Sequence, residues 1–385
     1  MRHQWTPPRL IVPLAAGSIA ALLACSPDRI TAPPSSAVPD GPAASVALRT
    51  REYYIAADIV EWDYAPSGLN QISGLPFGEE EETWVAPEHD RIGRLYLKAL
   101  YREYTDASFT TRKPIAPEWE HLGALGPLIR AQVGDTIKVV FRNNTTRAFS
   151  VHAHGVFYKK DSEGAPYDDG TSGADKDDDA VPPGGTHTYV WPVPARTGPG
   201  PDDGSSVLWM YHSHINEPKD VNSGLLGPII ITARGKARDD GRPKDVDREF
   251  VNLFMIYDEN DSWLIDENIA RSGVDTSEEE EFHESNLKHG INGYLYGNIP
   301  MMRMHVHERV RWYMFGLGNE VDLHTPHWHG QSLTFAGMRT DMVELLPGSM
   351  KVLDMRPDNP GIWLSHCHVN DHITAGMLSR FEVVP

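Results

Sequence analysis

Four pairs of histidines, each pair separated by a single residue, are the part of this sequence best suited to metal chemistry. The chain of 385 residues contains 18 histidines. In a β-strand, residues i and i+2 point to the same face, so each pair can present two imidazoles to one metal cluster. Imidazole binds copper, zinc, iron and nickel, and the pairs alone therefore leave the metal open. The pairs are His152 with His154, His212 with His214, His327 with His329, and His366 with His368.

The stretch LSHCHVNDHITAGM, residues 364–377, narrows the choice of metal. Cys367 lies between two histidines of one pair and therefore points to the opposite face of the strand. A thiolate, two imidazoles and a weak axial methionine form a blue-copper electron-transfer site. Cys367, His372 and Met377 supply three of these ligands, and His324, at an odd spacing from His327, is placed to supply the second imidazole. The alternative is a buried free cysteine among unrelated histidines.

Eight paired imidazoles exceed the needs of one metal ion. They fit a trinuclear copper cluster, in which electrons collected one at a time can reduce dioxygen to water. Cys367 is covalently flanked by His366 and His368, which gives electrons a short path from the blue copper to that cluster. A copper store or electron carrier is an alternative, which a variable copper content would reveal.

The histidine pairs belong to an internal repeat that organises the chain. In both halves a strand leads into a His-x-His-Gly motif, a Pro-Gly turn follows, and a second histidine pair comes next. Alternating segments such as Thr136–Phe141 and Arg309–Phe315 predict strands, and 33 glycines and 30 prolines are typical of a loop-rich, all-β protein. The polar segment Ala233–Asp247 is the expected boundary. We therefore predict two domains, residues 51–235 and 248–385.

Charge and the N-terminal residues bear on partners and location. The net charge of −19 argues against a nucleic-acid partner, because phosphate would be repelled. The acidic runs Glu79–Glu82 and Glu278–Glu281 are expected to be solvated loops. The apolar run Leu10–Ala24 predicts a signal peptide, residues 1–24.

The run ends in Leu-Leu-Ala-Cys, which resembles a bacterial lipobox, so we expect a protein exported to the cell envelope and attached to the membrane only by a lipid on Cys25. Residues 25–50, rich in Pro, Ser and Ala, would be a flexible tether. An ordinary signal peptide is the alternative. With Cys25 lipidated, Cys367 has no disulfide partner within the chain.

Beyond the histidines, several stretches resemble the multicopper oxidases, specifically their ceruloplasmin and hephaestin branch. They include REYYIAADIVEWDYAPSG, GPLIRAQVGDTIKV, GLGNEVDLHTPHWHGQS and PGIWLSHCHVNDHI, and they occur in both halves. The resemblance implies two cupredoxin domains, each a Greek-key β-sandwich or barrel, and one type 1, one type 2 and two type 3 coppers per functional unit. It assigns type 2 copper to His152 and His327, the type 3 pair to His154, His212, His214, His329, His366 and His368, and type 1 copper to His324, Cys367, His372 and Met377.

The first domain departs from a complete blue-copper domain. Ser213 occupies the cysteine position, and Phe149 and Leu225 occupy the positions of the first histidine and the methionine. We therefore expect no type 1 copper there. The missing site and the full histidine set also argue against the alternative of a copper nitrite reductase. Since ceruloplasmin closes six such domains into a ring, the resemblance implies a homotrimer whose cluster lies between subunits; a monomer with an internal cluster is the alternative.

The electron donor is inferred from the same resemblance. Glu284, His289 and Asp371 match residues of the ceruloplasmin iron site. Carboxylates are hard ligands suited to iron, so the expected donor is ferrous iron or another metal ion, with dioxygen as the acceptor. A laccase-like oxidase of phenols or aromatic amines is the alternative. Glu284 could also be part of a solvated acidic run, and Asp371 could merely orient His372.

Overall fold

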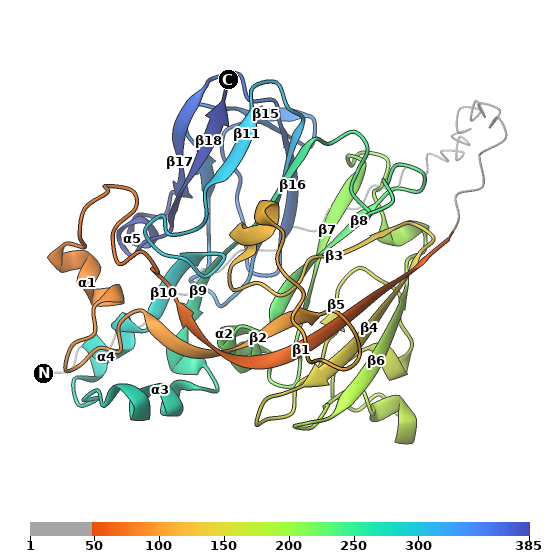
Figure 1. Cartoon of the computed structure of the whole chain (residues 1–385), viewed down its shortest axis with the longest axis horizontal. Helices are drawn as coiled ribbons and strands as arrows, with labels where there is room; N and C mark the ends of the chain where they lie inside the picture. Colours follow the sequence, from red (N-terminus) through yellow and green to blue (C-terminus); the bar gives the residue numbers. More distant parts are fainter. Residues whose placement is uncertain (1–47) are drawn as a thin grey trace, which may run out of the picture. The chain divides into compact units, whose positions relative to one another are not determined.

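The computed structural model describes residues 48–385, which belong to one unit. The signal peptide, Cys25 and most of the predicted tether lie outside the described residues. Between residues 48 and 385, no helix has the length and apolar character needed to cross a membrane. Strands arranged in sheets make up most of the regular structure (Figure 1).

The first half of the chain forms two sheets. One sheet has the order β2-β1-β4-β6, and the other has the order β3-β8-β7-β5. The strands are β1 (Thr50–Asp63), β2 (Leu95–Tyr104), β3 (Ile129–Gln132), β4 (Thr136–Asn143), β5 (His152–Ala153), β6 (Thr186–Pro192), β7 (Ser206–His212) and β8 (Leu226–Thr232).

The second half repeats this plan with the orders β10-β9-β12-β16-β14-β15 and β11-β18-β17-β13. Strand direction repeats as well, since β1 with β4 and β9 with β12 are parallel pairs, as are β3 with β8 and β11 with β18. The strands are β9 (Arg248–Asp258), β10 (Leu287–Ile291), β11 (Met302–His305), β12 (Val310–Gly316), β13 (Pro326–Trp328), β14 (Leu333–Phe335), β15 (Met338–Thr340), β16 (Met350–Met355), β17 (Gly361–Cys367) and β18 (Leu378–Val384).

Strand formation follows the alternation seen in the sequence. In β4, residues with intermediate burial alternate with buried ones, as expected for a strand with one face on a core. The predicted strands at Thr136–Phe141 and Arg309–Phe315 are confirmed as β4 and β12. Strand β12 is buried at every position because each of its two faces packs into an apolar core. The β14-β15 hairpin has no counterpart in residues 48–235.

Short helices connect the strands. The α-helices are α1 (Glu79–Val85), α2 (Glu217–Ser223), α3 (Ile265–Ser272), α4 (Glu279–Ser285) and α5 (Asn370–Thr374). The 3-10 helices are η1 (Pro117–Leu122), η2 (Lys160–Ser162), η3 (Gly173–Lys176), η4 (Ala195–Thr197) and η5 (Glu259–Asp261).

The prediction of loops at the two glutamate runs was wrong, because both runs begin helices, α1 and α4. Carboxylates in the first turn of a helix are stabilised by the positive end of the helix dipole.

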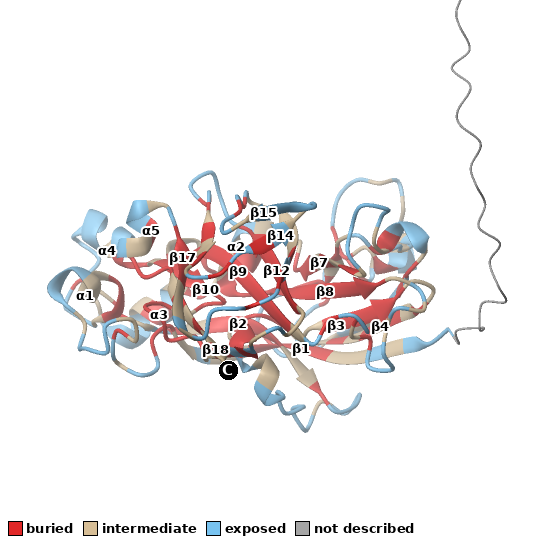
Figure 2. Cartoon of the chain, turned by 90° about the horizontal axis from the view of Figure 1, so that it is seen from above, coloured by how far each residue is buried: buried red, intermediate tan, exposed pale blue. Residues whose placement is uncertain are grey.

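Apolar cores lie within each half and also between the halves. The shared core joins Tyr64, Tyr96 and Met210 of the first half to Val251 and Tyr257 of the second. Figure 2 shows buried segments of β7, β8, β9 and β12 running through the middle of the unit. Each half alone would expose these apolar side chains to water. Their burial in the shared core therefore holds the two halves together.

A buried ion pair reinforces the contact between the halves. Lys98 in β2 pairs with Glu259 in η5, and Tyr64 donates a hydrogen bond to the same carboxylate oxygen. Lys98 also donates to the carbonyl of Asn222, at 2.8 Å. Both charged side chains are inaccessible to solvent, and breaking such a pair typically costs about 3–5 kcal/mol.

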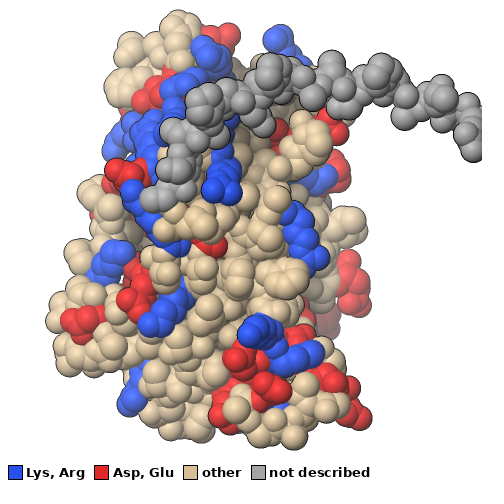
Figure 3. Space-filling model, turned by 90° about the vertical axis from the view of Figure 1, so that its right-hand side faces the viewer, with Lys and Arg blue, Asp and Glu red and all other residues tan. Residues whose placement is uncertain are grey.

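Charge is unevenly spread over the surface of this acidic protein. Figure 3 shows Lys and Arg side chains gathered on one part of a face, whereas another part of the same face mixes both signs.

Candidate metal centres

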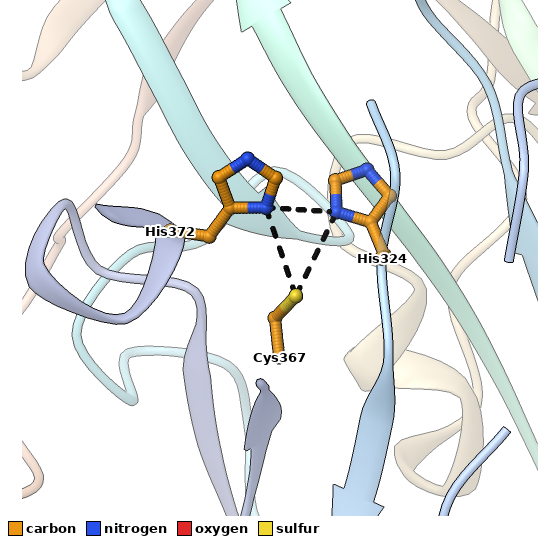
Figure 4. Close-up of side chains that lie close together, drawn as sticks. All are labelled: His324, Cys367 and His372. Carbon is orange, nitrogen blue, oxygen red and sulfur yellow. Dashed lines mark hydrogen bonds between the residues drawn. The ribbon is translucent and has the colours of Figure 1, made fainter. Parts of the chain in front are cut away.

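A cysteine and two histidines converge in the second half. The Nδ1 atoms of His324 and His372 lie 3.9 and 3.6 Å from Cys367 Sγ and 3.1 Å from each other (Figure 4). The structure thus brings together three of the four residues predicted to bind type 1 copper, with their donor atoms facing one point. All three side chains are buried.

Strand ends and a short helix position these residues. Cys367 ends β17, His372 lies in α5 immediately after it, and His324 is paired through its backbone with Leu345. Met377, the predicted axial ligand, is fully buried just before β18. Its N–H donates to the carbonyl of His372 at 2.8 Å, and its carbonyl accepts from the N–H of Cys367 at 3.2 Å. The backbone therefore holds Met377 beside the cysteine.

The surroundings of Cys367 favour its thiolate. Burial alone would raise the pKa of the thiol, but hydrogen bonds from His324 and His372, and from the backbone N–H groups of Thr325 and Val369 at 3.4 Å, lower this pKa to about 6. The thiolate is the form that binds metal ions. The protein thus supplies an ionised sulfur at neutral pH.

Asp322 is a further residue of this site, and sequence reasoning missed it. Its Oδ1 lies 3.3 Å from Nε2 of His324, on the side of the ring away from Cys367. The carboxylate is fully buried and accepts hydrogen bonds from the N–H groups of Ile256, at 2.7 Å, and Asn319, at 2.9 Å. Burial lowers the pKa of His324, but the contacts with Asp322 and Cys367 raise it above its ordinary value. Only the position of Asp322 two residues before His324 hinted at this contact.

The histidines of the first half form one group at the end of β5 and β7. His154 Nε2 lies 2.9 Å from His212 Nε2, and the ring centres of His152 and His214 are 5.0 Å apart. Nδ1 of His212 contacts the carbonyl of Ser213 at 3.0 Å, so its Nε2 is left free to bind a metal. Burial and neighbouring histidines lower the pKa values of His154 and His212, each to about 4.

The histidines of the second half repeat this arrangement. His329 Nε2 lies 3.1 Å from His366 Nε2, and His368 Nε2 lies 3.1 Å from His327 Nδ1. Nδ1 of His366 contacts the carbonyl of Cys367 at 2.6 Å, as His212 contacts its own neighbour. Burial lowers the pKa values of His327 and His366. A lowered pKa favours the neutral imidazole, the form that binds metals, at these histidines.

A glycine follows the first histidine pair in each half for a steric reason. Gly155 and Gly330 have φ angles of 74° and 66°, and an added Cβ would lie 2.1 Å from the ring of Trp209 or 2.6 Å from that of Trp363. The chain turns away from the metal site at these points. Glycine is thus required where each indole packs beneath the turn.

The two histidine groups do not contact each other. Within residues 48–385, no hydrogen bond or close ring contact joins a histidine of the first group to one of the second. Each group supplies four of the eight predicted cluster ligands. Carboxylates border both groups, with Glu217 Oε2 lying 3.4 Å from His214 Nε2 and Asp341 Oδ2 lying 3.5 Å from His327 Nε2.

A polar network occupies the place in the first half that corresponds to the cysteine site. Ser213 donates a hydrogen bond to Asp220 Oδ2 at 2.7 Å, and Trp263 donates to Oδ1 at 2.8 Å. Phe149 and Leu225 are buried in the apolar core of this half. The fully buried Asp220 also accepts from the N–H groups that follow His214, so a hydrogen-bonded carboxylate fixes this loop.

The predicted donor residues are only partly brought together. His289 is buried, with its ring centre 5.2 Å from that of His372 and 6.3 Å from that of Trp84. Asp371 is exposed at the start of α5. Glu284 is exposed on α4, where it lines an acidic hollow together with Asp90, Glu279, Glu280 and Glu281. Among the described contacts, none joins Glu284 to His289 or Asp371.

The donor atoms fit copper. Cys367, His324 and His372 provide one sulfur and two nitrogens with a buried methionine nearby, which is the ligand set of a blue-copper site. Within each histidine group, imidazole nitrogens of different residues lie 2.9–3.4 Å apart, as the ligand atoms of a shared ion do. Fold and donor residues together define a two-part β-protein with a candidate electron-transfer copper site next to candidate histidine-rich copper sites.

Comparison with known sequences identifies the family. Residues 122–236 and 270–385 match two sequence models that are each described as multicopper oxidase. The two ranges together include more than half of the chain, and the chain therefore belongs to the multicopper oxidase family. Proteins of this family are oxidoreductases that use copper as their cofactor.

Three similar relatives place the chain in the ceruloplasmin and hephaestin branch. Ferroxidase HEPHL1 of Mus musculus is 46% identical over 342 residues, which are 87% of this chain and 29% of that protein. Hephaestin of Homo sapiens is 43% identical, with the same shares covered. Ceruloplasmin of Mus musculus is 40% identical over 352 residues, 89% of this chain and 31% of that protein. The chain thus spans less than a third of these relatives.

Solved structures agree on the fold. The multicopper oxidase mgLAC superposes with a TM-score of 0.55 at 20% identity, covering 88% of each chain. The blue copper oxidase from Nitrosomonas europaea gives a TM-score of 0.53 at 18% identity, covering 88% of this chain and 86% of that one. The expectation of an all-β cupredoxin fold is confirmed.

Proposed function

We propose that this protein oxidises a donor one electron at a time at the Cys367 site and reduces dioxygen to water at the histidine sites. One observation carries the proposal. The cysteine of a buried His-Cys-His site is flanked in the chain by two histidines, His366 and His368, that belong to a different group of metal-binding nitrogens. A copper store has no need of this covalent connection.

The ligand assignment follows the geometry and the family. Type 1 copper would be held by His324, Cys367, His372 and Met377, type 2 copper by His152 and His327, and the type 3 pair by His154, His212, His214, His329, His366 and His368. With copper bound, the type 1 site would take electrons from the donor one at a time, and all four coppers together would supply the four electrons that reduce dioxygen to water. The carbonyls of Ser213 and Cys367 orient His212 and His366. The carboxylates of Glu217 and Asp341 lie beside His214 and His327 and would carry protons to the reduced oxygen.

The domain division proposed is residues 51–235 and 248–385, with type 1 copper only in the second domain. The polar network of Ser213 and Asp220 supports this division of roles, because it leaves no thiolate in the first domain. We also propose that the protein is exported and carries a lipid on Cys25. This part of the proposal rests on the sequence alone.

A homotrimer accounts for the separation of the two histidine groups. Each group is half of a cluster, and a head-to-tail ring would bring the first domain of one subunit against the second domain of the next. The test mixes two inactive variants, His154→Ala and His366→Ala. If the cluster lies between subunits, a native interface forms wherever the intact first domain of one variant meets the intact second domain of the other. In a 1:1 mixture this happens at about a quarter of the interfaces, and activity returns. A mixture of His327→Ala and His366→Ala, both altered in the same half, is the control and stays inactive.

For the donor, we propose ferrous iron. The acidic hollow around Glu284, the buried His289 beside His372, and the name of the relative HEPHL1, a ferroxidase, support this choice. A laccase-like oxidase of phenols or aromatic amines is the second candidate.

Dioxygen uptake with ferrous iron and with a methoxyphenol distinguishes the donors. The wild-type protein is expected to take up dioxygen faster with ferrous iron than with the phenol. The Glu284→Ala variant should lose this preference for iron, while its rate of dioxygen uptake with the phenol is unchanged. Glu267→Ala, which removes an exposed carboxylate of α3, is the control. Good oxidation of the phenol that neither variant changes would indicate a laccase-like enzyme instead.

A further inference from the structure

A cavity away from the histidine sites has the lining of a ligand site. It encloses about 370 Å³, a volume at the lower end of the range for small-molecule pockets. Its walls come from β1, the end of β2, residues 112–116, η1 and the segment leading into β3. The apolar part is formed by Tyr53, Ile115, Trp119, Leu122, Leu125 and Leu128.

The charged part of the lining is cationic in a protein whose net charge is −19. Five arginine or lysine side chains face two carboxylates. Most of the cations are already paired. Arg130 holds Glu249 through two hydrogen bonds of 3.0 and 3.1 Å, Arg112 pairs with Asp58, and Arg242 pairs with Glu118.

Arg102 is the exception. Within residues 48–385, no carboxylate lies within 4.0 Å of its guanidinium, and the only described acceptors are the carbonyls of Tyr101, at 3.1 Å, and Leu125, at 3.5 Å. Both carbonyls contact the same nitrogen, so the remaining N–H groups have no acceptor among the described residues. Burial and then the nearby Arg112 lower the pKa of Arg102 to about 10. A cation in such surroundings is stabilised by an added anion.

Trp119 gives the cavity a flat surface with a defined orientation. The guanidinium groups of Arg130 and Arg242 lie 4.9 and 5.7 Å from its ring centre. These guanidinium groups hold the indole in place, and a planar apolar group can pack against the indole and the leucine side chains.

We infer that this cavity binds a small organic anion with a flat apolar body, such as an aromatic carboxylate, with its anionic group on Arg102 and its ring beside Trp119. The inference is independent of the proposed oxidase function, because no predicted copper ligand lines the cavity.

Binding would couple to the contact between the two halves of the chain. Trp119 belongs to η1, whose His121 accepts a hydrogen bond from the N–H of Val251 in β9 at 3.1 Å. The amide of Asn292 donates to the carbonyl of His121 at 2.7 Å. A ligand that holds η1 in place therefore stabilises the junction of the first half with the second, and we expect it to raise the melting temperature.

The test measures binding of 2-naphthoate to the copper-loaded full-length protein by calorimetry. Neutral 2-naphthamide has the same ring without the charge. Wild type is expected to bind naphthoate at least about tenfold more tightly than the amide, and Arg102→Gln is expected to lose about tenfold or more of the naphthoate affinity, as for a hydrogen-bonded charge. Arg303→Gln, which removes an exposed arginine of β11, is the matched control and should bind as wild type does.

A second variant guards against indirect effects of the Arg102 substitution. Ala116→Phe fills the cavity from an exposed loop position and should abolish binding without affecting the fold. The inference is overturned if wild type does not bind naphthoate, as would happen if a second copy of the chain covered the cavity. Equal affinity for acid and amide, or binding that survives in both cavity variants, also overturns it.

Discussion

Replacing Asp322 with asparagine removes a buried negative charge next to His324 and should raise the reduction potential of the type 1 copper. The carboxylate oxygen is 3.3 Å from Nε2 of the histidine. A unit charge at the opposite nitrogen of that ring is roughly 6 Å away, and at an effective dielectric constant of about 20 the interaction is about 3 kcal/mol. For a one-electron couple this corresponds to on the order of 100 mV. The loss of negative charge favours the reduced ion, so the shift is upward.

The assay is a redox titration of the blue absorption in the copper-loaded protein. Asp358→Asn, which removes an exposed carboxylate of the same half, is the matched control and should leave the potential unchanged. The melting temperature of the copper-free variant shows whether the loop held by the N–H groups of Ile256 and Asn319 has survived. A folded, blue Asp322→Asn protein with the wild-type potential, or a lower one, would refute the electrostatic reasoning.

Three further outcomes are expected. In the copper-free protein, His121→Gln should weaken the acid dependence of the melting temperature, because burial holds the pKa of His121 at about 4 and its protonation would break the hydrogen bond from Val251. In the unfolded chain this histidine is protonated below about pH 6.5, whereas in the folded protein it stays neutral down to about pH 4. As the pH falls from 6.5 to 4, this histidine therefore lowers the free energy of unfolding by up to about 1.4 kcal/mol per pH unit. Met377→Leu should keep a blue copper but raise its potential, measured by the same redox titration, since a donor to the oxidised ion is lost. Gly330→Ala should lower the copper content of the histidine sites, measured by metal analysis, because the new methyl group meets Trp363.

Each of these outcomes has a control. The exposed His305→Gln should leave the acid dependence unchanged, and a steep dependence remaining in His121→Gln would contradict the assignment. An unchanged potential in Met377→Leu would exclude the methionine from the site. Gly337→Ala, at a glycine with a similar φ but open space around it, separates backbone strain from the clash with Trp363.

Much of the site could be predicted because its ligands come from local patterns. The single-residue spacing of the histidine pairs places two imidazoles on one strand face, and Cys367 necessarily points to the other. The structure bears this out, with His366 directed to the histidine group and Cys367 to the buried site. Repeated strands with repeated turns likewise allowed an all-β fold with an internal repeat to be predicted.

The features that escaped prediction depend on contacts between distant residues. Asp322 reaches its position through a hydrogen bond from Ile256, 66 positions earlier, and the network of Asp220 uses Trp263 from the other half. The helices at the glutamate runs were missed because a run of charged residues alone suggests a solvated loop. In the structure α1 and α4 pack against each other, a contact that the sequence does not reveal. The cavity around Arg102 is invisible in sequence, since an arginine without an acidic partner is defined only by what surrounds it.

The central claim is that electrons pass from the Cys367 site to dioxygen bound at the histidine sites. The most direct measurement is donor-independent. The copper-loaded protein is chemically reduced, freed of reductant and mixed with dioxygen, and the return of the blue absorption is followed in wild type and in His366→Ala. We predict rapid return in wild type and greatly slowed return in the variant, which still holds its type 1 copper. Equal rates of return in the two proteins would contradict the account.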